Sequence, residues 1–151
     1  MKRPLLLLIT ILFLLSMTAC DGYNGIMREH LGDEDNYYAV DATLCSYKEA
    51  NDCIYLYVTV EDKSAFDSYE AGSEELRLEL VGDNCEALSE YLAKEEIRVG
   101  DRITVRCSTW IYMDSTFYYV AEIVIQDQTF LSFDDGLNNI IKYMDDHKSV
   151  L

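Results

Sequence analysis

Five cysteines carry the most reactive side chains of the sequence. Cys20 directly follows an apolar N-terminal stretch, and the other four are Cys45, Cys53, Cys85 and Cys107. Outside the cytoplasm an even number of cysteines permits two disulfides, with more than one possible connectivity. No pair has the C-x-x-C spacing of a thiol redox or zinc motif. We therefore expect disulfides or buried thiols, and no metal or other cofactor.

Residues suited to general acid or base catalysis are few. The two histidines, His30 and His147, lie near the ends of the mature chain, where a rigid scaffold is not expected to hold them. The sequence has no G-x-S-x-G, P-loop or H-E-x-x-H motif. Adjacent acids such as Asp134 and Asp135 diverge on a helix, and the helix dipole favours such charges at an N-terminus. We predict that the protein is not an enzyme.

The stretch that ends at Cys20 has the three parts of a secretory leader: Lys2 and Arg3, an apolar run, and small residues. The run is too short to cross a bilayer, which needs roughly 20 apolar residues. Leu15-Ser16-Met17-Thr18-Ala19-Cys20 resembles the lipobox of bacterial lipoproteins, whose cysteine is lipidated after cleavage. The resemblance implies a signal peptide over 1–19, a lipid on Cys20, and attachment to the extracytoplasmic face of the cell membrane. The alternative is an ordinary cleaved leader with a chance cysteine near its boundary.

The charge of the mature chain limits its partners. Loss of residues 1–19 removes Lys2 and Arg3 and no acid, which leaves 12 − 2 = 10 basic residues against 28 acidic ones. The formal net charge is then 10 − 28 = −18. Nucleic acids and anionic lipids attract Lys and Arg, so both are disfavoured as partners. The alternative interpretation is that the acidity only keeps an exported protein soluble.

The hydrophobic pattern predicts one domain with a short lead-in. Residues 20–36 are rich in Gly and acids, and we interpret them as a flexible tether. Period-two alternation then predicts strands at 40–45, 53–60, 76–81 and 103–108, and the apolar run 117–125 predicts a fifth. An acid-then-Glu capping box at Asp83 and the spacing of Cys85, Leu88 and Leu92 predict a helix between the third and fourth strands. A second apolar stripe predicts a C-terminal helix over 134–151, packed on a β domain at 37–133.

The predicted strand positions give the cysteines specific places. A turn over 46–52 would set Cys45 and Cys53 opposite each other on the non-core face of a hairpin, close enough for a disulfide. Cys85 and Cys107 both face inward by parity. This second pair is expected either to form a bridge or to fill the core as small apolar residues.

Three strands, a helix and two strands is the order of a five-stranded OB barrel. The segment 99–105, Val-Gly-Asp-Arg-Ile-Thr-Val, followed by Tyr119-Val-Ala-Glu-Ile, resembles the last two strands of small OB-fold domains. The nearest are the tRNA-anticodon-binding-like domains of uncharacterised bacterial lipoproteins. The resemblance implies a mainly β, OB-like barrel and no particular activity. An open sandwich or a half-barrel with a flanking helix has the same periodicity.

An OB barrel takes ligands on the face of its second and third strands and on the neighbouring loops. Aromatic side chains with polar tips suit contact with sugars, peptides or proteins. We predict a module that binds an envelope protein, peptide or glycan; capture of extracellular single-stranded nucleic acid is the alternative. These rings could instead pack under the connection at 61–75 or the terminal helix. The predicted ligand-binding residues are Tyr55, Tyr57, Arg77, Glu79, Trp110 and Tyr112.

The lipid anchor can be tested at Cys20 itself. We expect Cys20→Ala to accumulate as an unprocessed precursor or to be released into the medium, because the residue that accepts the lipid is gone. Cell fractionation and mass spectrometry of the N-terminal peptide measure both outcomes. Normal cleavage together with retention on the membrane would place the anchor elsewhere.

Overall fold

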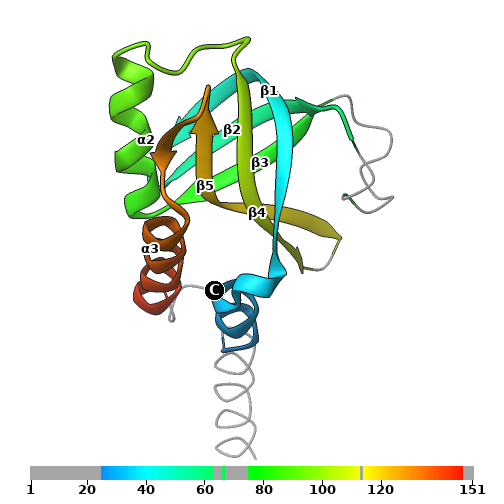
Figure 1. Cartoon of the computed structure of the whole chain (residues 1–151). Coiled ribbons are helices and arrows are strands. Elements are labelled where there is room, and N and C mark those ends of the chain that lie inside the picture. The colour runs from blue at the N-terminus through cyan, green and yellow to red at the C-terminus, as the bar shows by residue number, and fades with distance from the viewer. Residues whose placement is uncertain (1–24, 63–65, 67–74, 113, 148–151) are drawn as a thin grey trace, which may run out of the picture.

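A computed structural model describes residues 25–62, 66, 75–112 and 114–147 (Figure 1). Strands are the commonest element, so the predicted mainly β class is confirmed. The helices lie where the periodicity places them, one between the third and fourth strands and one at the C-terminal side. In chain order the elements are a helical segment at 25–32, η1 (Glu34–Asn36), β1 (Tyr37–Ala50), β2 (Cys53–Val60), β3 (Leu76–Val81), α2 (Asp83–Ala93), β4 (Arg102–Tyr112), β5 (Ser115–Ile125), β6 (Gln128–Leu131) and α3 (Phe133–Asp146).

The six strands form one sheet in the order β3-β2-β1-β4-β5-β6. Neighbours along this order run antiparallel. A parallel pair between Glu79 of β3 and Tyr119 of β5 then joins distant parts of the sheet, so that it closes in a ring. The sequence pattern includes only a short extension at 129–131, which the structure defines as the strand β6.

One hydrophobic core lies inside this ring. The alternating residues of the predicted strands supply it, and Leu44, Ile54, Leu78 and Val105 are almost completely buried. The predicted inward parity of the first four strands is therefore confirmed. α2 adds Cys85, Leu88 and Leu92 to the same core.

The start of α2 differs from the predicted capping box. The helix begins at Asp83, its N-cap is Gly82, and no side chain caps it. Gly82 has a φ of 58°, a left-handed conformation that glycine adopts without steric cost. Asp83 instead forms an ion pair with Lys142 of α3, with 2.6 Å between Oδ2 and Nζ. α3, in contrast, has a side-chain cap, because Ser132 Oγ accepts a hydrogen bond from the Asp135 amide.

A second core lies on the outer face of the sheet, beneath α3 and the helical segment 25–32. The predicted tether over 20–36 is therefore wrong from residue 25 onward, while residues 20–24 lie outside the described part. Met27 and Leu31, four residues apart, are both buried against the domain. Two apolar residues suffice here because the sheet and α3 already present an apolar surface to cover.

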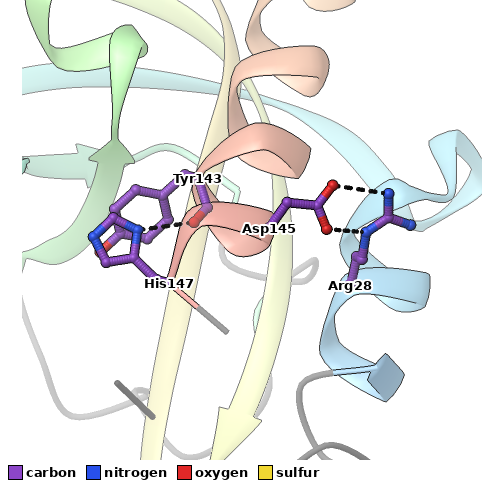
Figure 2. A network of polar contacts seen from close by, with 4 residues as sticks. All are labelled: Arg28, Tyr143, Asp145 and His147. Carbon is purple, nitrogen blue, oxygen red and sulfur yellow. Dashed lines mark hydrogen bonds and ion pairs between the residues drawn. The ribbon is translucent and has the colours of Figure 1, made fainter. Parts of the chain in front are cut away.

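Polar contacts hold this helical segment in place. Figure 2 shows the guanidinium of Arg28 reaching Asp145 of α3, with Nε 2.7 Å from Oδ1 and Nη2 3.1 Å from Oδ2. Tyr37 donates its hydroxyl proton to the Leu31 carbonyl. Among the residues that the structure describes, no helix is long and apolar enough to cross a membrane.

α3 approaches β5 more closely than a side chain would allow. A Cβ added at Gly136 would lie 1.9 Å from the carbonyl oxygen of Ala121. Asn84 of α2 is completely buried beside this contact and donates to the Gly136 carbonyl at 3.1 Å. Asn139 in turn donates to the Asn84 Oδ1 at 2.9 Å. One buried amide thus connects α2 with α3.

We expect Gly136→Ala to lower the free energy of unfolding by about 3 kcal/mol, because the added methyl group forces α3 away from β5. Thermal and urea denaturation measure the change. Gly25→Ala is the matched control, since no atom lies within 4 Å of its added Cβ. Equal stability of the two variants would contradict the close approach of Gly136 to Ala121.

Candidate functional site

The outward side chains of five strands form two rows on one face of the sheet. Strand register defines each row, because directly opposed residues point to the same side. The β3–β5 pair at Glu79 and Tyr119 continues both rows from β3 onto β5. In the order β1, β2, β3, β5 and β4, one row is Lys48, Tyr55, Glu79, Tyr119 and Ser108, and the other is Ser46, Tyr57, Arg77, Phe117 and Trp110.

Arg77 lies near the centre of this face. Its side chain is 44% exposed, and its Cζ lies 5.4 Å from the centroid of the Tyr55 ring and 5.9 Å from that of Phe117. Its Nη2 lies 2.8 Å from Glu79 Oε1. Such cation–π contacts and a charge partner restrict where the guanidinium can move. The sequence places Arg77 on this face correctly, and the structure adds the two rings that flank it.

Glu79 is a buried carboxylate, only 5% exposed. Burial raises its pKa, whereas the nearby positive charge of Arg77 acts in the opposite direction. Oε1 makes the ion pair with Arg77, but it accepts no well-aligned hydrogen bond from the described residues. The short distance between Arg77 and Glu79 is that of an ion pair, so Glu79 serves mainly to hold Arg77.

Tyr55 and Tyr57 are half-buried on the outer face, as their parity predicts. They belong neither to the inner core nor to the core beneath α3. Phe117, which is partly buried, extends the aromatic surface, and it stacks on the buried Tyr119 with 6.4 Å between ring centroids. The sequence does not identify these two residues because β5 is apolar on both sides, so alternation does not show which of its side chains point outward. The pairing of β3 with β5 shows that these two do.

Trp110 and Tyr112 lie at the far end of β4, and they differ in their surroundings. Trp110 is partly buried, with its ring centroid 5.4 Å from that of His30 in the helical segment 25–32. Tyr112 is 42% exposed. The structure therefore places Tyr55, Tyr57 and Glu79 next to Arg77, packs Trp110 against the helical segment 25–32, and leaves Tyr112 at the edge of the face.

His30 lies close to a serine, an arrangement that could suggest a nucleophile and its base. Its Nε2 is 3.3 Å from Ser108 Oγ, but it is nearer, at 2.9 Å, to the Thr109 carbonyl oxygen. A carbonyl only accepts hydrogen bonds, so we assign the ring proton to Nε2, which then has no lone pair to deprotonate Ser108. Ser108 is also completely buried. This pair is structural, although the expectation of a loosely held His30 was wrong.

The predicted bridge between Cys45 and Cys53 does not form, because the hairpin is longer than the sequence suggests. β1 continues to Ala50, which pairs with Cys53, and only Asn51 and Asp52 make the turn. Cys45 falls in a bulge between Leu44 and Ser46, several residues away along the strand. All four of these cysteines are free thiols. Burial raises the pKa of Cys85 and of Cys107 to about 12, consistent with space-filling roles.

A polar pocket of about 350 Å³ lies between the β1–β2 turn, α2 and α3. Asp52, Asp83, Glu86 and Lys142 contribute to its lining. Lys142 is already paired with Asp83. In the described ranges, no group of three or more His, Cys, Asp or Glu residues is placed to hold a metal ion. The aromatic face around Arg77 is therefore the stronger candidate site.

The buried state of Glu79 predicts a specific pH dependence. Its folded pKa is raised above the ordinary value of 4.5, so its contribution to stability is fully present below pH 4.5 and is lost as the pH rises through the folded pKa. We expect the stability of Glu79→Gln relative to wild type to increase as the pH rises through the folded pKa of Glu79. Urea denaturation as a function of pH measures the difference, with Glu90→Gln on the exposed side of α2 as control. A difference between Glu79→Gln and wild type that is constant with pH would contradict the burial of a charged carboxylate.

Comparisons with known proteins assign the chain to no family. No protein-family model matches it, and a search of curated proteins finds no similar sequence. The function is therefore inferred from the residues of this chain and their geometry.

Proposed function

We propose that this chain is an extracytoplasmic lipoprotein, anchored to the cell membrane through Cys20, whose domain binds an envelope protein, peptide or glycan. The leader and its lipobox-like end support the anchor. The domain is proposed to be an OB-like barrel with β6 and α3 added. The order of strands and helices, the antiparallel β1–β4 pairing and the parallel β3–β5 pairing support this assignment.

The observation that carries the binding proposal is the position of Arg77 between Tyr55 and Phe117. The rings offer apolar faces on which a sugar ring or an apolar side chain can pack. The half-exposed guanidinium offers hydrogen-bond donors whose direction is fixed by Glu79. A neutral or weakly charged ligand suits this site, because Glu79 balances the charge of Arg77.

Binding of single-stranded nucleic acid would require a different charge on the same face. Proteins that bind single strands combine stacking rings with a basic groove that follows the phosphates. Here Lys48 and Arg77 are the basic residues of the two rows, and the mature chain carries a formal charge of 10 − 28 = −18. Aromatic residues alone do not overcome this repulsion at physiological salt.

Substitutions on the face separate binding from folding. We expect Arg77→Ala, Tyr55→Ala and Tyr57→Ala each to weaken ligand binding by about 2 kcal/mol, as central Arg and Tyr residues of interfaces do. Isothermal calorimetry against envelope glycans and peptides, and against a labelled single strand, measures the loss and identifies the class. Arg98→Ala, before β4, and Tyr47→Ala, on the opposite side of β1 from Ser46 and Lys48, are the matched controls.

Thermal melts of the same variants check the alternative. If the two tyrosines served mainly in packing, their replacement would lower stability by about 3 to 5 kcal/mol. Such a loss, or unchanged binding by Arg77→Ala, would remove the case for this site. Salt-sensitive binding of the single strand would instead favour the nucleic-acid function.

A further inference from the structure

Large apolar side chains are exposed at the end of the molecule where the helical segment 25–32 meets the β4–β5 hairpin. Ile26 is 61% exposed, Ile111 56% and Tyr112 42%. In Figure 1 the helical segment, in blue, and the C-terminal end of β4 lie on the side of the molecule away from α2. We call this surface the hairpin end.

Contacts between the two elements fix their relative positions at the hairpin end. His30 lies against Trp110 and against the carbonyl of Thr109. Ile26 precedes His30 by four residues, so it lies one helical turn away on the same side of the segment. Tyr112 follows Trp110 by two residues and shares its face of β4. Ile111, between Trp110 and Tyr112, points to the opposite face of β4, so the exposed side chains lie on both faces of this strand beside the His30–Trp110 contact.

The position of Cys20 limits which end of the domain can face a membrane. Five Cα–Cα steps connect Cys20 to residue 25, and even a fully extended chain covers at most about 18 Å in that distance. Residue 25 begins a segment that Met27, Leu31 and the Arg28–Asp145 ion pair fix to the domain. A lipid on Cys20 therefore draws to the bilayer surface the end of the domain that carries the helical segment 25–32, which includes the hairpin end and the C-terminal turn of α3.

We propose that the hairpin end lies against the lipid bilayer, with Ile26, Ile111 and Tyr112 in the interfacial region. This inference rests on the proposed lipidation of Cys20. Tyrosine suits the boundary between headgroups and acyl chains, where its ring is in an apolar layer and its hydroxyl is hydrated. The acidic surface repels anionic headgroups, so zwitterionic lipid is the expected partner.

This placement changes the role of one predicted ligand residue. Tyr112 belongs to the membrane contact, whereas Tyr55, Tyr57 and Arg77 remain available to a ligand. Since both sets lie on strands of the same sheet face, the ligand site opens beside the bilayer. Its ligand must then be available at the membrane surface.

Tryptophan fluorescence tests the contact in the full-length, processed protein. The chain has a single tryptophan, so Trp110→Phe gives a background in which one reporter is introduced at a time. Tyr112→Trp reports on the hairpin end. Tyr47→Trp is the control, because Tyr47 is 41% exposed and lies on the β1–β2 hairpin, whose turn contacts the start of α2. Each protein is reconstituted into phosphatidylcholine vesicles with or without brominated acyl chains.

We expect the brominated lipid to quench the Tyr112→Trp reporter, with a blue shift on reconstitution, and to leave the Tyr47→Trp reporter unchanged. Adding Ile26→Ser and Ile111→Ser should reduce the quenching. Equal quenching of both reporters, or none at position 112, overturns the proposed contact when mass spectrometry shows a lipid on Cys20. A Cys20 without lipid overturns the anchor as well, which distinguishes the two failures.

Discussion

The contact between Gly136 and the carbonyl of Ala121 determines how the outer layer of this protein is built. An α-helix can lie directly on a strand only where the side chain between them is absent, and a Cβ at Gly136 would come within 1.9 Å of that oxygen. Asn84 fixes the same place from α2, because its amide donates to Gly136 while its oxygen accepts from Asn139. A buried amide with these partners is stable, whereas an unpaired one would cost about 1 to 3 kcal/mol. α2, α3 and β5 are thereby held in one arrangement.

This arrangement divides the outer face of the sheet into a covered part and an open part. Ala121 lies beneath α3, and Tyr119, two residues earlier, is still largely buried at its border. Phe117, one step further along β5, is only partly buried and lies near Arg77. The candidate site therefore begins where α3 no longer covers β5. Its position follows from helix packing as much as from the residues that line it.

The sequence predicts the parts of this fold that depend on local alternation. Ile54, Leu56 and Val58 alternate with Tyr55 and Tyr57, and this pattern alone identifies the outward face of β2. The alternation of apolar and polar residues does not predict which way side chains point where a strand contains a bulge or is buried on both sides. The bulge at Cys45 and the short turn after Ala50 are set by the pairing of β1 with β2 and β4, which composition does not reveal.

The prediction for residues 25–32 is wrong for a different reason. The segment has too few apolar residues to form a stable helix alone. Their burial depends on a surface that only the folded sheet and α3 provide. The positions of Phe117 and Tyr119 also depend on a long-range contact. The parallel pair between β3 and β5, which are distant in sequence, brings these residues to the side of the sheet that carries Arg77. Long-range contacts of this kind cannot be predicted from periodicity.

The docked segment also changes what a lipid anchor does. A flexible coil of 16 Cα–Cα steps would have a root-mean-square length of about 22 Å, whereas a coil of five steps would have about 12 Å. The longer tether would let the domain turn freely above the membrane. The shorter one, attached to a segment that Arg28, Met27 and Leu31 fix in place, restricts both height and orientation. The lipid proposed on Cys20 would then position the proposed Arg77 site as well as retain the protein, and it would favour ligands at the bilayer surface over those deeper in the envelope.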